Sequence, residues 1–160
     1  MRFERISYSY EEKTGKQVES YNFHKAASVL AEYGFDCVRI TNDWRGADFL
    51  AYHSESGQTL EVQLKTCLVI SKKYLHYPDL YMCFTLDGTG NWYLVKHSLL
   101  MEIVEEKAPH WLTSKSWTGN RGEKFSYTGT QVIRDALEEF AYLPKHEHLG
   151  FREAKNNISP

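Results

Sequence analysis

The sequence predicts an α/β fold in which a central mixed β-sheet is flanked by helices. Apolar and polar residues alternate strictly over Leu60–Lys65, and a period of two is typical of a β-strand. The strand-like segment Ala47–His53 is separated from it by a short polar loop that contains Gly57, which favours a hairpin. Amphipathic helical patterns lie on both sides of these strands, over 16–33 and 130–142.

The first helix is expected over 16–33 and should end at Gly34, since glycine is favoured at the C-terminal cap. Its apolar residues recur at intervals of roughly three and four, as one buried helix face requires. These residues are Val18, Tyr21, Ala26, Val29 and Leu30. The chain then enters a predicted strand, Phe35–Ile40, and the polar segment 41–46 leads on to Ala47–His53.

Two more strands are expected further along the chain. Leu80–Leu86 is apolar enough to be a strand that is buried on both faces. A turn at 87–90, rich in glycine, should lead to the returning strand Asn91–Val95.

The C-terminal third is expected to be helical with one long loop. Ser98 is a candidate cap for a helix from 99 to about 107. Residues 110–129 are predicted to form a long irregular loop, and the amphipathic helix 130–142 should stop at Pro144.

Length and composition predict one domain of 160 residues that can bury a core. Within it we expect a nuclease-like core at about 15–97, a helical and aromatic extension at 98–143 and a polar tail at 144–160. The net charge of −2 neither indicates nor excludes nucleic-acid binding. Three widely spaced cysteines without a CxxC pair, and the lack of a long apolar run, predict a cytoplasmic protein with reduced thiols.

A row of polar side chains on the predicted hairpin carries the chemistry. Glu61, Gln63 and Lys65 leave one face of their strand, and the hairpin should bring Asp48 within reach of them. Mg²⁺ takes one or two carboxylates, together with water and substrate phosphate. Asp48 and Glu61 would supply the carboxylates, and the Gln63 carbonyl would be a neutral ligand. The Lys65 ammonium would lie beside the attacking water. Metal-assisted phosphodiester hydrolysis is therefore the favoured reaction.

The segments Gly46–Leu50 and Glu61–Thr66 resemble the PD-(D/E)xK nuclease superfamily, and most of all the QxK branch seen in Mrr-like restriction and some homing endonucleases. The resemblance covers about 15–97. It implies a restriction-endonuclease-like αβββαβ core and a DNA endonuclease that depends on Mg²⁺ or Mn²⁺. In that family the positions of Asp48, Gln63 and Lys65 are catalytic.

The resemblance also implies a glutamate from the first helix, and Glu19 is similarly placed as a catalytic and metal-binding residue. Two positions depart from the family pattern. Ala47 replaces the proline, and Gln63 replaces an acid. Glu61 or Glu19 would then have to supply the missing negative charge.

Residues for nucleic-acid contact are sought among basic and aromatic side chains. The candidates are Arg45, Lys72, Lys73, Tyr74, Arg121 and Lys124. For Lys72, Lys73 and Tyr74 an ordinary solvated loop is an equal alternative. Since cutting both strands of double-stranded DNA needs two sites, a homodimer or a higher homo-oligomer is expected.

Two other functions remain open from the sequence. The chain could be a catalytically inactive nuclease-like fold that binds nucleic acid or protein, as an antitoxin, immunity or scaffold protein does. It could also be an RNA-processing enzyme with the same site. A half-solvated strand with no site at all is the simplest alternative for Leu60–Lys65.

Overall fold

The structure, a computed structural model, describes residues 14–86, 91–119, 124–127 and 131–142. Its strands are β1 (Phe35–Trp44), β2 (Ala47–His53), β3 (Thr59–Leu64), β4 (Leu68–Ser71), β5 (Leu80–Phe84), β6 (Trp92–Lys96), β7 (Lys124–Tyr127) and β8 (Ala141–Tyr142). Its α-helices are α1 (Gly15–Ala31), α2 (His97–Lys107), α3 (Lys115–Thr118) and α4 (Gln131–Leu137). Its 3₁₀ helices are η2 (Lys72–His76), η3 (Pro109–Trp111) and η4 (Glu138–Phe140).

The main sheet has six strands in the order β1-β2-β3-β5-β6-β8. All neighbouring pairs are antiparallel except β3 and β5, which are parallel. The predicted mixed sheet flanked by helices is therefore confirmed. The order α1, β1, β2, β3 matches the start of an αβββαβ core, whereas β4 and η2 occupy the crossover from β3 to β5, where that pattern has a helix.

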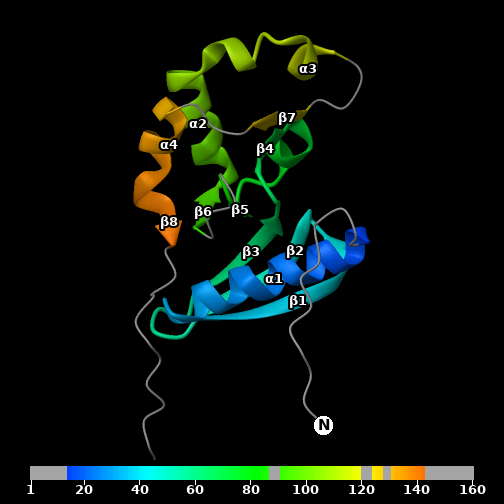
Figure 1. Cartoon of the computed structure of the whole chain (residues 1–160), viewed down its shortest axis with the longest axis vertical. Coiled ribbons are helices and arrows are strands. Elements are labelled where there is room, and N and C mark those ends of the chain that lie inside the picture. Colours follow the sequence, from blue (N-terminus) through cyan, green and yellow to red (C-terminus); the bar gives the residue numbers. More distant parts are fainter. Residues whose placement is uncertain (1–13, 87–90, 120–123, 128–130, 143–160) are drawn as a thin grey trace, which may run out of the picture.

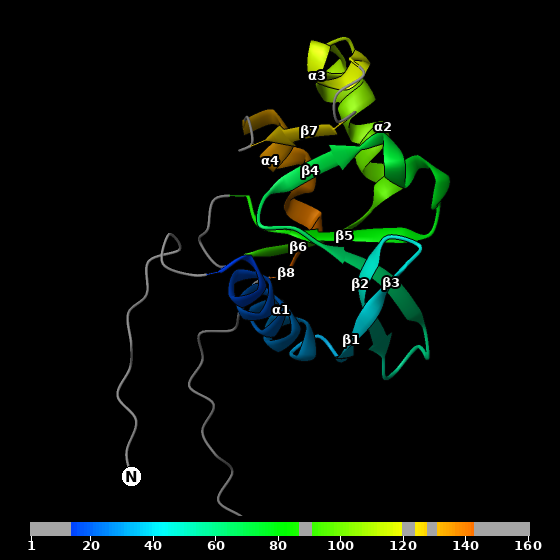
Figure 2. The same ribbon diagram turned by 90° about the vertical axis from the view of Figure 1, so that its right-hand side faces the viewer.

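Helix α1 covers one face of the sheet (Figures 1 and 2). A capping box starts it: Gln17 N–H donates to the Thr14 side chain, and Thr14 N–H donates to the Gln17 side chain at 2.9 Å. The helix buries an apolar stripe against inward-facing residues of β2 and β3. The cluster includes Phe23, Ala26, Leu30, Phe49, Ala51, Leu60 and Val62. A leucine buried like this contributes roughly 2 kcal/mol relative to an exposed one.

The opposite face of the sheet is covered by α2, α4, η2 and the two-stranded sheet of β4 and β7 (Figure 2). Its cluster includes Ile70, Tyr74, Leu80, Met82, Phe84, Leu100, Val104 and Trp111. Strand β5 therefore buries Leu80 and Met82 in this cluster and Cys83 in the α1 cluster. The prediction that this segment is a strand buried on both faces is confirmed.

Several sequence predictions for the C-terminal third are wrong. Helix α2 begins at His97 rather than after Ser98, because β6 runs directly into it and Lys96 takes the cap position with extended backbone angles. The supposed loop contains η3, α3 and β7. Ser114 caps α3, and Lys124–Tyr127 pairs with β4.

The last predicted helix is shorter than expected. Helix α4 ends at Leu137, and the chain continues through η4 into β8, where Ala141 and Tyr142 pair with β6. The predictions for the first 13 residues, the turn at 87–90 and the tail at 144–160 lie outside the described residues. None of the helices in the described part of the chain combines the length and the apolar character that crossing a bilayer requires.

Candidate functional site

Asp48 lies where β2 and β3 part from each other. The last paired residues of these strands are Phe49 and Val62. Beyond them β3 continues along β5, where Leu64 is opposite Cys83. The backbone N–H of Leu64, which has no β2 partner, donates to Asp48 Oδ2 at 2.8 Å. The Asp48 carboxylate thus takes the place of the missing strand and lies at the fork.

The side chain of Gln63 holds the Asp48 carboxylate from a second direction. It is 5% exposed. Its Nε2 donates to Asp48 Oδ2 and makes a longer contact of 3.4 Å to the carbonyl oxygen of Leu64. Its Oε1 accepts a 2.7 Å hydrogen bond from the Tyr74 hydroxyl. The structure therefore brings Asp48 and Gln63 together, and it adds Tyr74 behind them.

Burial is the main influence on the protonation of the Asp48 carboxylate. Burial raises its pKa above the ordinary value, and the negative charge of Glu19 acts in the same direction. The N–H of Leu64, the positive charge of Lys65 and the Gln63 amide lower the pKa but do not compensate fully. Both Lys65 and Glu19 are therefore within electrostatic reach of Asp48.

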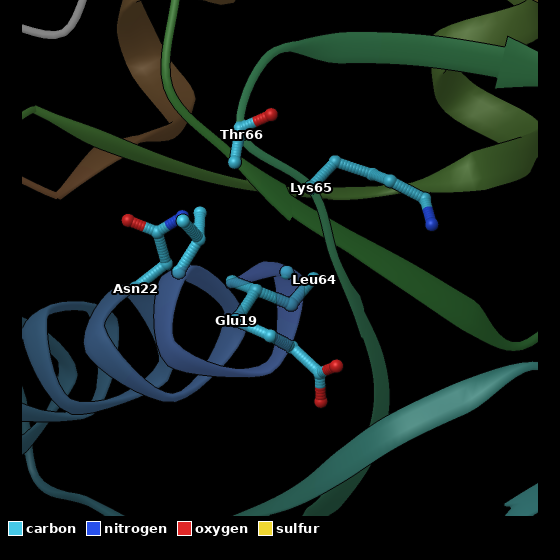
Figure 3. A pocket seen from close by; sticks show the side chains of 7 residues that line it. Glu19, Asn22, Leu64, Lys65 and Thr66 are labelled. Carbon is cyan, nitrogen blue, oxygen red and sulfur yellow. The ribbon is translucent and has the colours of Figure 1, made fainter. Parts of the chain in front are cut away.

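Glu19 and Lys65 line a cavity of about 210 Å³ beside this fork. Figure 3 shows Glu19 coming from the first turns of α1 and Lys65 from the chain that leaves β3. Their charged ends do not meet in this view. Glu19 instead forms an ion pair with Arg39 of β1, whose guanidinium also lies 5.4 Å from the centre of the Phe23 ring.

Glu61 is not brought into this group. Its carboxylate lies 3.7 Å from the Arg45 guanidinium. Across the described ranges, no three His, Cys, Asp or Glu side chains come together as a potential metal site. The expected set of three carboxylates from Asp48, Glu61 and Glu19 is thus not assembled, because the Glu61 carboxylate is directed to Arg45.

The residues expected to contact nucleic acid differ in their exposure to solvent. Tyr74, a candidate for nucleic-acid contact, is not accessible for it, because the residue is 1% exposed and its ring is packed inside the protein. Lys73 is exposed, and the Lys72 ammonium lies 5.5 Å from the centre of the Trp117 ring. Lys124 pairs through its backbone with Ser71, directly before η2. Arg121 lies outside the described residues.

Three features of the site were missed from the sequence. Arg39 has a weak signal, since it is the one cation within the predicted strand Phe35–Ile40. The backbone of Leu64 has no signal, because every residue except proline carries the same N–H and C=O groups. Tyr74 seemed to belong to a basic loop, and only the tertiary contact with Gln63 shows its role.

No protein-family model matches this chain, and no curated protein matches it. Among solved structures the chain is similar to a Holliday junction resolvase, Hjc, from the archaeal hyperthermophile Archaeoglobus fulgidus. The two are 12% identical, with a TM-score of 0.34, over 52% of this chain and 76% of the resolvase chain.

Proposed function

We propose that this protein is a divalent-metal-dependent endonuclease of the PD-(D/E)xK type, QxK branch, which hydrolyses DNA phosphodiester bonds. The observation that carries the proposal is the fork between β2 and β3, where Asp48 lies with Gln63 on one side and Lys65 and Glu19 within electrostatic reach. Mg²⁺ or Mn²⁺ is the proposed cofactor.

The donors at the fork suit a hard cation. Both hydrogen bonds of the Asp48 carboxylate go to Oδ2, so that Oδ1 has no hydrogen bond from any described residue. The Leu64 carbonyl oxygen makes a long contact of 3.4 Å with Gln63 Nε2. Carboxylate and carbonyl oxygens are the ligands that Mg²⁺ prefers. A half-buried carboxylate with a raised pKa would also be stabilised by a nearby cation.

Asp48 and the Leu64 carbonyl would hold the ion, and Glu19 could join them by leaving Arg39. When bound, a divalent cation polarises a phosphate oxygen and makes water a better nucleophile. The Lys65 ammonium would orient the attacking water and stabilise the negative charge that develops on the phosphate oxygens. Gln63 would keep the Asp48 carboxylate in place.

Lysines and an arginine around η2 are proposed to hold the phosphate backbone of double-stranded DNA. Lys72 and Lys73 are on η2, and Lys124 is paired with the residue before it. Arg45 is followed by Gly46, which packs against the Tyr74 ring. Two of these residues are therefore part of the element that carries Tyr74, and the backbones of Arg45 and Lys124 lie next to residues that contact or precede it. A homodimer is proposed for cutting both strands.

A plasmid-nicking assay tests the proposal. Purified protein is incubated with supercoiled plasmid and Mg²⁺ or Mn²⁺, and in parallel with EDTA. Nicked or linear plasmid is expected only with the metals. Lys65→Ala should bind DNA without cutting it, and Asp48→Ala should lose the metal-dependent cleavage. Lys107→Ala, an exposed lysine of α2 whose ammonium pairs with Glu106, is the matched control and should cut normally. Cleavage that persists in Lys65→Ala or in Asp48→Ala would reject the site.

A second candidate is a nuclease-like fold that only binds nucleic acid or protein. The favouring observation is that Gln63 stands in the acidic position and that Glu19 is engaged by Arg39. This candidate predicts that labelled DNA is retarded in a gel while plasmid stays intact with either metal. Substituting an RNA duplex in the same assays would reveal an RNA substrate.

A further inference from the structure

A buried hydroxyl group lies directly behind the proposed metal site. Tyr74 donates to Gln63 Oε1 at 2.7 Å, and the other end of the same amide donates to Asp48. Both side chains are shielded from water, with Tyr74 1% and Gln63 5% exposed. Tyr74, Gln63 and Asp48 thus form a continuous hydrogen-bonded chain from the cluster under α2 to the fork.

The orientation of the Gln63 amide in this chain does not suit a cation. An amide offers an acceptor oxygen on one side and two donor hydrogens on the other. Here the NH₂ group faces Asp48, and the oxygen faces Tyr74. An ion next to Asp48 would therefore meet the donor side of Gln63, whereas a carboxylate at this position would present an oxygen in either orientation.

We propose that Tyr74 is a positioning residue that allows the Gln63 amide to turn over when a divalent cation binds beside Asp48. In the ion-free protein the Tyr74 hydroxyl donates to Gln63 Oε1. In the ion-bound protein the amide oxygen faces the cation, and the NH₂ group donates to the Tyr74 hydroxyl oxygen. This inference rests on the proposed function, since it requires that the fork binds a metal ion.

Tyr74 is suited to this because its hydroxyl can donate or accept while its ring stays fixed. The ring packs over Gly46, where an added Cβ would lie 3.2 Å from Tyr74 Cε1. On another side it meets the ring of His97 edge-on, with centroids 5.6 Å apart. On the Tyr74 side, the turn of the amide requires a new direction for the hydroxyl hydrogen and no new position of the ring.

Removing the hydroxyl should weaken metal binding. In Tyr74→Phe either orientation of the amide leaves one end without its partner, Oε1 in the ion-free protein and the NH₂ group in the ion-bound protein. An orphaned buried N–H is less well tolerated than an under-satisfied carbonyl oxygen, so the ion-bound state should lose more. We expect Mn²⁺ to bind about fivefold more weakly to this variant, because only the difference between these two losses enters the affinity. In the Gln63→Glu background the same substitution should change Mn²⁺ affinity by less than about twofold, because a carboxylate needs no turn.

The experiment is a double-mutant cycle on the full chain, with Mn²⁺ affinity measured by isothermal titration calorimetry. The four proteins are the wild type, Tyr74→Phe, Gln63→Glu and the double variant, and thermal unfolding without metal checks that each is folded. The inference is supported if Tyr74→Phe weakens Mn²⁺ binding when residue 63 is the natural glutamine and not in the Gln63→Glu background. An equal loss in both backgrounds, or no loss in either, overturns it and leaves the metal site standing. Absence of Mn²⁺ binding to the wild type would instead overturn the proposed function.

A second measurement needs no variant and covers the case in which Tyr74→Phe does not fold. With ¹⁵N-labelled glutamine, the side-chain NH₂ protons of Gln63 should gain nuclear Overhauser contacts to the Tyr74 ring protons on addition of Mg²⁺. Unchanged contacts at a Mg²⁺ concentration that saturates the site would show that the amide does not turn.

Discussion

Asp48 Oδ2 accepts a 2.8 Å hydrogen bond from the backbone N–H of Leu64, at the point where β3 has left β2 for β5. One carboxylate oxygen is thereby used to close the sheet, and the other has no hydrogen bond from the described residues. Oδ2 of Asp48 therefore has a structural role, and Oδ1 is the oxygen that can bind a metal ion. Substitutions at Asp48 can separate these two roles.

Asp48→Asn should reduce the rate of metal-dependent cleavage 100-fold or more without destabilising the fold. The asparagine oxygen can still accept from Leu64, whereas the negative charge, which burial disfavours, is removed. We expect a thermal midpoint in metal-free buffer no lower than that of the wild type. Asp48→Ala should lose both cleavage and stability, since it leaves the Leu64 N–H unpaired. A midpoint for Asp48→Asn as low as that of Asp48→Ala would contradict this separation.

Gly46→Ala should destabilise the protein by about 1–3 kcal/mol, because the position has a φ of +83° and a new Cβ would lie 3.2 Å from the Tyr74 ring. Gly57→Ala is the matched control, since Gly57 has a φ of +68° but no atom within 4 Å of the added Cβ. The difference between the two variants in urea unfolding measures the effect of the side chains around the added Cβ, of which the Tyr74 ring is the nearest. Equal losses would mean that only the backbone conformation matters.

Leu80→Ala should cost about 2–5 kcal/mol of unfolding free energy. Leu80 is fully buried on β5, in the middle strands of the sheet, and its removal leaves a cavity in the cluster under α2. Leu75→Ala is the control, because Leu75 is 48% exposed and should change stability by less than about 1 kcal/mol. Urea denaturation of both variants measures the difference. Similar losses would place Leu80 outside a tightly packed core.

Arg39→Gln should lower the Mg²⁺ concentration for half-maximal cleavage a few-fold. The Arg39 guanidinium pairs with Glu19, which is within electrostatic reach of Asp48. Removing the guanidinium frees the Glu19 carboxylate to bind the metal ion and takes a competing positive charge away from the site. Stability should change by less than about 1 kcal/mol, as is usual for partly exposed ion pairs. Lys107→Gln serves as the control for loss of a surface cation. An increased Mg²⁺ requirement would show that Arg39 assists the site instead.

The hairpin could be predicted from sequence because its signals are local. The alternation over Leu60–Lys65 and the Gly57 loop depend on neighbouring residues alone, and β2 has the expected bounds. What could not be predicted depends on contacts between distant segments. The pairing of Lys124–Tyr127 with β4 and the burial of Tyr74 against Gln63 are not visible in any short stretch of chain.

The polar row itself shows the same limit. Alternation correctly placed Glu61 and Gln63 on one face of β3, but it cannot say which charged group will approach each of them. Arg45, at a φ of +53° in the turn between β1 and β2, comes near Glu61 and takes it out of the expected metal site. Roles for Asp48, Gln63, Lys65 and Glu19 in catalysis, and the single-domain organisation, stay predictions.

His97 should make the protein less stable as the pH falls from 6.5 to 4. Its side chain is 1% exposed, its Nε2 has no hydrogen-bond partner among the described residues, and burial lowers its pKa to about 4. The unfolded chain takes up this proton near pH 6.5 and the folded chain only near 4, so that protons favour unfolding between these values. The full loss of unfolding free energy is about 3 kcal/mol. Above pH 6.5 this group makes no contribution to the pH dependence of stability.

Urea unfolding of the wild type and of His97→Phe, from pH 7.5 to 4.5, measures this contribution. The phenylalanine retains an aromatic ring beside Tyr74 and removes the buried titrating group. The fall in unfolding free energy below pH 6.5 should therefore be smaller in the variant. His110→Gln, at an exposed position next to Trp111, should keep the slope of the wild type. If His97→Phe also keeps that slope, the acid sensitivity arises from other groups and His97 does not contribute to it.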